Sequence, residues 1–139
     1  MGKINFSRVI LCGIIAAIII DLIASVMNTV FLGSWWNAVA AAMNQQPITM
    51  VQIALFKVWG LVVGFAVAWI YAGFRPRFGA AHRTAIIAGV TTWVLASFCG
   101  CFAAAIAGYP VGLMIATCVI GFFAIVIASL VGNYFYQEA

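Results

Sequence analysis

The sequence predicts an all-α fold, an integral membrane four-helix bundle, from its composition, its apolar runs and its basic residues. The chain of 139 residues is 68% hydrophobic and 6% charged, with a mean hydropathy of +1.24. Soluble domains carry roughly 25% charged residues, so the composition excludes that class. No room remains for a separate soluble domain, and residues 1–139 are expected to form a single transmembrane domain.

Four apolar runs predict spans at about residues 9–32, 49–74, 84–107 and 111–135. Each run is long enough to cross about 30 Å of hydrocarbon as a helix. Helices are expected because they satisfy every backbone polar group within their own segment. The first run is too long for a signal peptide, so we expect it to be retained as a span. Pro76 is expected to end the second helix.

The basic residues predict the orientation of the chain. Lys3 and Arg8 precede the first span, and Arg75, Arg77 and Arg83 lie between the second and the third. The loops at 33–48 and 108–110 carry no charged residue. Because Lys and Arg concentrate in cytoplasmic loops, both termini and the 75–83 loop are expected in the cytoplasm.

The two uncharged loops differ in length. The loop at 33–48 begins with Trp35 and Trp36, and tryptophan is typical of membrane interfaces. A short interfacial helix and a partly ordered loop explain this segment equally well. The 108–110 connection predicts a tight antiparallel hairpin, with Pro110 in the first turn of the fourth helix.

Small residues recur at every fourth position in two of the spans, a pattern that lets helix backbones approach closely in lipid. The rows are Gly60, Gly64, Ala68 and Ala72 in the second span, and Ala124, Ala128 and Gly132 in the fourth. They predict a packed bundle without indicating a function.

Two ionisable residues lie inside the spans, and they are the main candidates for a functional site. Asp21 lies about 16 Å below the outer end of the first span and Lys57 about 12 Å below that of the second. An unpaired charge at such depth costs at least about 2.5–3.5 kcal/mol, so we expect the two side chains to pair. Ser25 and Asn28 share a helix face with Asp21, which predicts a polar stripe.

The stripe has several interpretations. It fits a buried ion pair that fixes helix register, and it fits the wall of a water-accessible path. Lys57 also fits an anchor that snorkels to the surface without meeting Asp21. In that arrangement Asp21 is protonated or faces a partner chain.

Motifs for cofactors, metals and catalysis are missing from the sequence. His82, the single histidine, falls in the basic loop, so a haem ligand set within the spans is excluded. Cys99, Cys101 and Cys118 with Met114 offer soft ligands, but the first two point in different directions on a helix. We therefore expect no metal, no cofactor, no enzymatic activity and no nucleic-acid partner.

The 75–83 loop is the most distinctive polar segment. Arg75, Arg77 and Arg83 are suited to anionic lipid headgroups or to an acidic partner, and they also explain the topology alone. The stretch Trp69–Gly79, followed by Thr84–Gly89, resembles small four-helix bacterial inner-membrane proteins with an Arg-Pro-Arg-Phe-Gly loop. The resemblance implies a four-span fold in the bacterial inner membrane and brings no activity with it.

Three functions follow as hypotheses. The first is a non-enzymatic accessory or scaffold subunit of a larger membrane assembly, in contact with lipids and with other subunits or copies of itself. The second is a small oligomeric transporter or channel with a polar path lined by Asp21, Ser25, Asn28 and Lys57. The third is a lipid or quinone site near the tryptophans of the spans, Trp59, Trp69 and Trp93.

Overall fold

The computed structural model describes residues 4–137, which form helices joined by turns and contain no strand. Helix α1 (Phe6–Val26) continues into a π-helical turn, η1 (Met27–Phe31), and then α2 (Gly33–Ala42). Helix α3 (Met50–Phe78) is followed by α4 (His82–Trp93), a second π-helical turn, η2 (Val94–Phe98), and α5 (Cys99–Ile106). Helix α6 (Val111–Tyr134) completes the described chain.

Four helical segments in this part of the chain are long and apolar enough to cross a membrane. They are Phe6–Phe31, Met50–Phe78, His82–Ile106 and Val111–Tyr134. Each begins and ends within about four residues of its prediction, as expected from hydropathy alone. The predicted all-α fold, with four helices long and apolar enough to span a membrane, is therefore confirmed.

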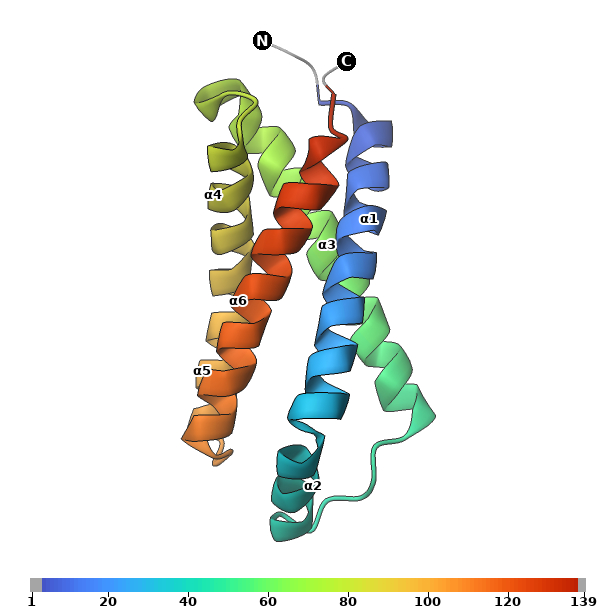
Figure 1. The fold of residues 1–139 in the computed structure, drawn as a ribbon, viewed down its shortest axis with the longest axis vertical. Coiled ribbons are helices and arrows are strands. Elements are labelled where there is room, and N and C mark those ends of the chain that lie inside the picture. Colours follow the sequence, from blue (N-terminus) through green and yellow to red (C-terminus); the bar gives the residue numbers. More distant parts are fainter. Residues whose placement is uncertain (1–3, 138–139) are drawn as a thin grey trace.

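The four spans run antiparallel, and two ends of the bundle can be distinguished (Figure 1). The described ends of the chain and the α3–α4 connection lie at one end, here called the termini end. Helix α2 and the α5–α6 turn lie at the other, here called the α2 end. Helix α3 diverges from α1 toward the α2 end, and residues 43–49 connect it to α2 (Figure 1).

Local sequence signals fix the helix starts. The Asn5 side chain accepts a hydrogen bond from the Arg8 N–H at 3.2 Å, which caps α1. At α3 the Gln52 N–H donates to Thr49 Oγ1 at 3.3 Å, and the Thr49 N–H donates to Gln52 Oε1 at 2.8 Å. This capping box places the start of α3 within one residue of the prediction.

The predicted end of α3 at Pro76 was wrong. The helix continues through Pro76 to Phe78, and Gly79 follows with a φ of +84°. A proline in the last turn lacks only one N–H donor, and the Gly79 N–H still donates to the Arg75 carbonyl at 2.8 Å. Gly79 is therefore the residue that turns the chain toward α4.

The two small-residue rows pack inside the bundle against α1. A Cβ added at Gly64 would lie 2.6 Å from the Ala17 nitrogen and 2.6 Å from the Gly13 carbonyl oxygen. A Cβ added at Gly132 would lie 2.9 Å from the Cys12 carbonyl oxygen. The other members, Gly60, Ala68, Ala72, Ala124 and Ala128, are also buried. The rows thus pack α1 closely between α3 and α6.

Candidate functional site

The Asp21 side chain lies in the contact between α1 and α3. A Cβ added at Gly60 would lie 2.0 Å from Asp21 Oδ1, so the glycine makes room for the carboxylate. Asp21 is half-buried. Neither carboxylate oxygen accepts a hydrogen bond or forms an ion pair with any residue of the described chain. The charge-bearing atoms of Asp21 therefore have no hydrogen-bond donor among residues 4–137.

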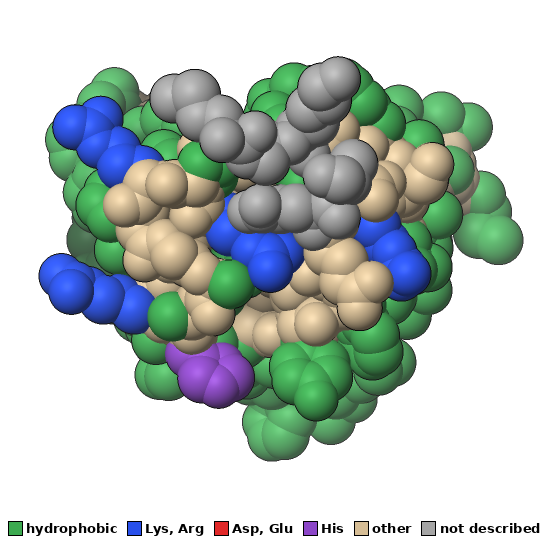
Figure 2. Space-filling view, turned by 90° about the horizontal axis from the view of Figure 1, so that it is seen from above, with side chains coloured by type: hydrophobic (Ala, Val, Ile, Leu, Met, Phe, Trp, Pro, Cys, Tyr) green, Lys and Arg blue, Asp and Glu red, His purple; other side chains and the backbone are tan. Residues whose placement is uncertain are grey.

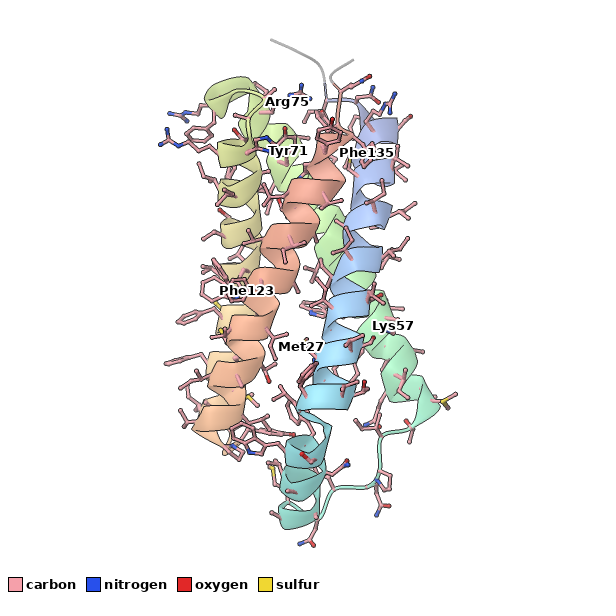
Figure 3. All side chains as sticks on the ribbon, in the orientation of Figure 1. Met27, Lys57, Tyr71, Arg75, Phe123 and Phe135 are labelled. Atoms are coloured by element: carbon pink, nitrogen blue, oxygen red, sulfur yellow. The ribbon has the colours of Figure 1, made fainter. Side chains whose placement is uncertain are left out.

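Lys57 reaches across from α3 to α1, one turn before Gly60 (Figure 3). Its ammonium donates to Ser25 Oγ and, at 3.4 Å, to the backbone carbonyl of Asp21. The Ser25 hydroxyl donates to the same carbonyl at 2.5 Å. Asp21, Ser25 and Lys57 thus form one cluster, which we call the polar site.

The predicted pair between the Asp21 carboxylate and Lys57 differs from what the structure contains. The two residues meet, but the ammonium binds the Asp21 backbone oxygen rather than the carboxylate. The physical reason is the direction of the Asp21 side chain, which points to Gly60. The estimated depths placed Lys57 near Asp21, but they could not predict which Asp21 oxygen Lys57 would bind.

Asn28 belongs to a different contact from the rest of the predicted stripe. Its Nδ2 donates to the Ala24 carbonyl at 2.8 Å, and its Oδ1 accepts from Trp36 Nε1 at 3.0 Å. Asn28 lies in η1, where the Leu32 N–H donates to the Met27 carbonyl, five residues back. This π-helical turn departs from the 3.6-residue period on which the stripe was predicted. Asn28 therefore joins α1 to α2.

The part of α3 around Lys57 is not covered by the described chain. Every residue from Met50 to Trp59 is exposed, on all sides of the helix. The bundle begins at Gly60, the first buried residue of α3. The polar site therefore lies where α3 leaves α1, within a stretch of ten residues that the described chain leaves exposed.

The termini end carries a group of basic side chains, which Figure 2 shows in a view onto that end. Arg77 and Arg83 are exposed, whereas Arg75 is half-buried. Arg75 Nη1 donates to the Tyr136 carbonyl at 2.8 Å, and the guanidinium lies 5.1 Å from the centroid of the Tyr136 ring. Arg75 was predicted as a lipid or partner contact, but its described contacts join α3 to the residues after α6.

Tyr136 is the residue at the termini end that the sequence did not single out. It is buried, its ring packs edge-on against Tyr71 at 5.7 Å, and its hydroxyl accepts the Asn5 N–H at 3.3 Å. Tyr71 and Arg75 lie side by side on α3 (Figure 3). No sequence signal marked Tyr136, because it follows the last predicted span.

A second buried contact joins α4 to α6. The Ser129 hydroxyl donates to the Ala85 carbonyl at 2.6 Å and accepts from Asn133 Nδ2 at 3.0 Å. Both side chains are buried. Two polar residues four apart in an apolar helix are a signal that could have been found, since such groups bind across helices in membranes.

The paired tryptophans lie at the α2 end. Trp36 packs near Tyr109 with ring centroids 6.4 Å apart. Trp35 lies over α6, because a Cβ added at Gly112 would lie 3.3 Å from its ring. Gln45 Nε2 also donates to the Tyr109 hydroxyl at 2.9 Å. The segment predicted as either helix or loop is therefore helical at Gly33–Ala42 and is attached to the α5–α6 turn.

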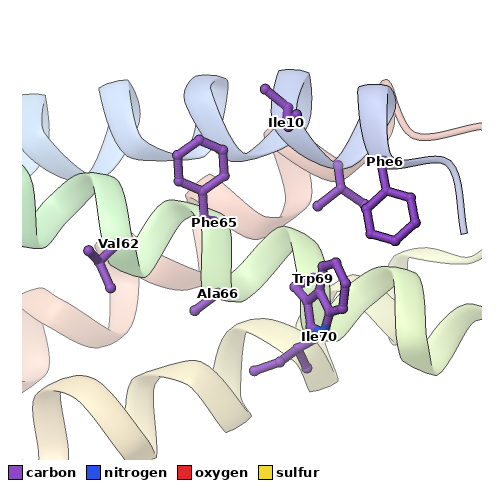
Figure 4. A pocket seen from close by; sticks show the side chains of 8 residues that line it. Phe6, Ile10, Val62, Phe65, Ala66, Trp69 and Ile70 are labelled. Carbon is purple, nitrogen blue, oxygen red and sulfur yellow. The ribbon is translucent and has the colours of Figure 1, made fainter.

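Two apolar grooves run along the exposed sides of α3. The larger, of about 460 Å³, lies between α1 and α3, and Trp69 and Phe65 line it (Figure 4). The smaller, of about 180 Å³, includes Trp59 and Thr92. Trp93 lies in neither; its Nε1 donates to the Cys118 carbonyl at 3.0 Å. The three tryptophans considered for a lipid or quinone site thus do not converge.

The cysteines do not assemble into a ligand set. Cys12 is buried in the core, Cys99 is exposed, and Cys101 and Cys118 are half-buried on the facing helices α5 and α6. Within residues 4–137 no three His, Cys, Asp or Glu side chains come close enough to hold a metal ion together.

Comparison of the chain with protein-family models, with curated proteins and with solved structures finds no match. The class of protein is therefore defined by the fold. Four helices suited to crossing a bilayer make this chain a multi-pass membrane protein built as a helical bundle. The resemblance carried by Arg75–Gly79 stays a prediction.

Proposed function

We propose that this protein is a non-enzymatic accessory or scaffold subunit of a larger assembly in the bacterial inner membrane. One observation carries the proposal. The polar site and the ten residues from Met50 to Trp59 belong to two candidate spans, and the described chain leaves Asp21 and Ser25 half-buried and all of Met50–Trp59 exposed. A protein that places charged groups on such a surface is suited to contact another chain there.

The energetic argument concerns the Asp21 carboxylate and the Lys57 ammonium. A charged side chain facing lipid costs at least about 2.5–3.5 kcal/mol on the insertion scale. The Asp21 carboxylate accepts no hydrogen bond from the described chain that would offset this cost. A partner chain covering the polar site removes lipid from both charges and supplies the missing donor.

The orientation supports the same arrangement. The termini end, with Arg8, Arg75, Arg77 and Arg83, faces the cytoplasm according to the excess of basic residues there. Helix α2, with Trp35, then lies in the outer interface. Arg77 and Arg83 are exposed and contact anionic headgroups at the inner surface. The polar site accordingly lies in the outer half of the bilayer.

Photo-crosslinking in native membranes tests the proposal. A photoreactive residue replaces Val58, which is exposed beside Lys57, or Val119, which is exposed on α6 and serves as the matched control. We expect a protein adduct, identified by mass spectrometry, from position 58, and lipid adducts alone from position 119. Lipid adducts alone from position 58 would overturn the proposal.

A small oligomeric transporter or channel is the second candidate, and one observation favours it. Lys57 and Ser25 lie on the outside of the bundle, so a polar path could form only between chains. Asn28 was predicted to line this path, but its side chain accepts a hydrogen bond from Trp36 instead. A flux assay in vesicles separates the candidates. A transporter loses its flux in Asp21→Asn with the fold retained, whereas a scaffold shows background flux throughout.

A further inference from the structure

We infer that a second copy of this chain covers the polar site, in a two-fold dimer in which Asp21 of each copy pairs with Lys57 of the other. The inference rests on the proposed function, because it takes the polar site as a lateral contact surface. It goes further by naming the occupant of that surface.

A count of donors and acceptors supports the pairing. An ammonium group has three donors. Lys57 directs hydrogen bonds at Ser25 Oγ and at the Asp21 carbonyl, so one donor is unused in the described chain. The Asp21 carboxylate has only acceptors, and none of them is used. Each copy therefore has one donor and one acceptor group to offer, and the two groups are complementary in charge.

The depth of the two groups fits a symmetric pair. Two copies with the same orientation in a membrane are related by an axis along the membrane normal, which keeps every atom at its own depth. Asp21 and Lys57 must then lie at one depth to meet across the axis. They do, because the Lys57 Nζ lies 3.4 Å from the backbone oxygen of Asp21.

The exposed part of α3 provides the surface on which the second copy packs. All of Met50–Trp59 is exposed, and the polar site lies at its inner end beside Gly60. A different protein would have to bring a donor for the Asp21 carboxylate and an acceptor for the Lys57 ammonium at matching depth. A second copy brings both by construction, which makes it the occupant that the charges favour.

Mixing two variants tests the dimer. Asp21→Asn keeps Lys57, and Lys57→Met keeps Asp21, so neither variant can form an interchain pair with itself. A mixed dimer restores one pair and leaves the second position neutral. We expect each variant alone, in lipid vesicles, to lose self-association by about tenfold or more, and the mixture to regain most of it. Energy transfer between differently labelled copies measures this, with Lys57→Arg as the control that retains pairing.

The outcomes separate the alternatives. A mixture that associates no better than either variant, while the unchanged chain dimerises, overturns interchain pairing. Interchain pairing is also overturned if the wild-type protein is monomeric in the vesicles. An adduct at position 58 with a different membrane protein overturns the dimer and leaves the accessory role standing. Circular dichroism checks that each variant keeps its helices.

A charge-swapped chain provides a second, independent test. Asp21→Lys combined with Lys57→Asp restores both pairs within a dimer of swapped copies. Against unchanged copies it places like charges together at both positions. We expect swapped copies to associate with one another and to exclude unchanged copies. Free mixing of swapped and unchanged copies would contradict the inference.

Discussion

Asp21 on α1 lies against Gly60 on α3, with Oδ1 only 2.0 Å from where a glycine Cβ would stand. The Lys57 ammonium hydrogen-bonds to the Asp21 backbone carbonyl and to Ser25 rather than to this carboxylate. No residue of the described part of the chain donates a hydrogen bond to the Asp21 carboxylate. The relation between these two residues is the basis of the proposed contact surface.

Replacement of Gly60 by alanine tests the position of the Asp21 side chain separately from the stability of the fold. The added methyl group meets the end of a flexible side chain, so Asp21 moves aside at small cost to folding. We expect Gly60→Ala to lower self-association about as much as Asp21→Asn does, with the free energy of unfolding changed by less than about 1 kcal/mol. Unfolding in mixed detergent and energy transfer in vesicles measure the two quantities. A large loss of stability with association unchanged would contradict this account of Gly60.

Gly64→Ala is expected to destabilise the fold, because its Cβ would meet backbone atoms of α1 at 2.6 Å. Backbone cannot move aside as a side chain can, so α1 and α3 must separate. We expect a loss of about 1–3 kcal/mol in the free energy of unfolding. Gly73→Ala is the matched control, since nothing lies within 4 Å of that position on the same helix. Equal effects at the two glycines would refute the packing argument.

The buried hydroxyl of Ser129 is expected to stabilise the contact between α4 and α6. Ser129→Ala removes the bond to the Ala85 carbonyl and leaves Asn133 without its acceptor. The expected cost is about 0.6 kcal/mol, the average for such bonds in membranes, and at most about 1.7 kcal/mol. Ser7→Ala, at an exposed position of α1, should leave the unfolding free energy unchanged.

Tyr136 is expected to hold the end of α6 to α3. Tyr136→Ala removes the ring beneath the Arg75 guanidinium and the acceptor for the Asn5 N–H. We expect a loss of about 3–5 kcal/mol in stability, as for a buried aromatic side chain, and faster proteolysis of the C-terminal residues. Tyr134→Ala, two residues earlier and 78% exposed, is the control with little expected effect.

The exposed arginines of the α3–α4 connection are expected to bind lipid. Arg77→Gln with Arg83→Gln should weaken anionic-lipid retention by about 1 kcal/mol per residue near the surface. Native mass spectrometry of the purified protein counts the retained lipids. Arg75→Gln should instead lower stability, because Arg75 is bonded to the Tyr136 carbonyl. A lipid loss confined to Arg75→Gln would reverse this assignment.

Much of the fold could be predicted because the lengths of the apolar runs determine where the spans lie. Hydropathy located the four spans, and the depth estimate brought Lys57 to the backbone of Asp21 but not to its carboxylate. The π-helical turns could not be predicted, since the apolar runs continue unchanged through them, and so Asn28 was assigned to the wrong contact. The direction of the Asp21 side chain depends on the space beside Gly60, which exists only once α1 and α3 have packed together.

The mass of the protein in native membrane fragments tests the central claim most directly. The account predicts a main species of twice the 14.8 kDa chain mass, alone or within a larger complex, in membranes that contain the unchanged protein. It also predicts that Asp21→Asn and Lys57→Met each shift this species to the single-chain mass. An unchanged protein found only at the single-chain mass would contradict the claim that another chain covers Asp21 and Lys57.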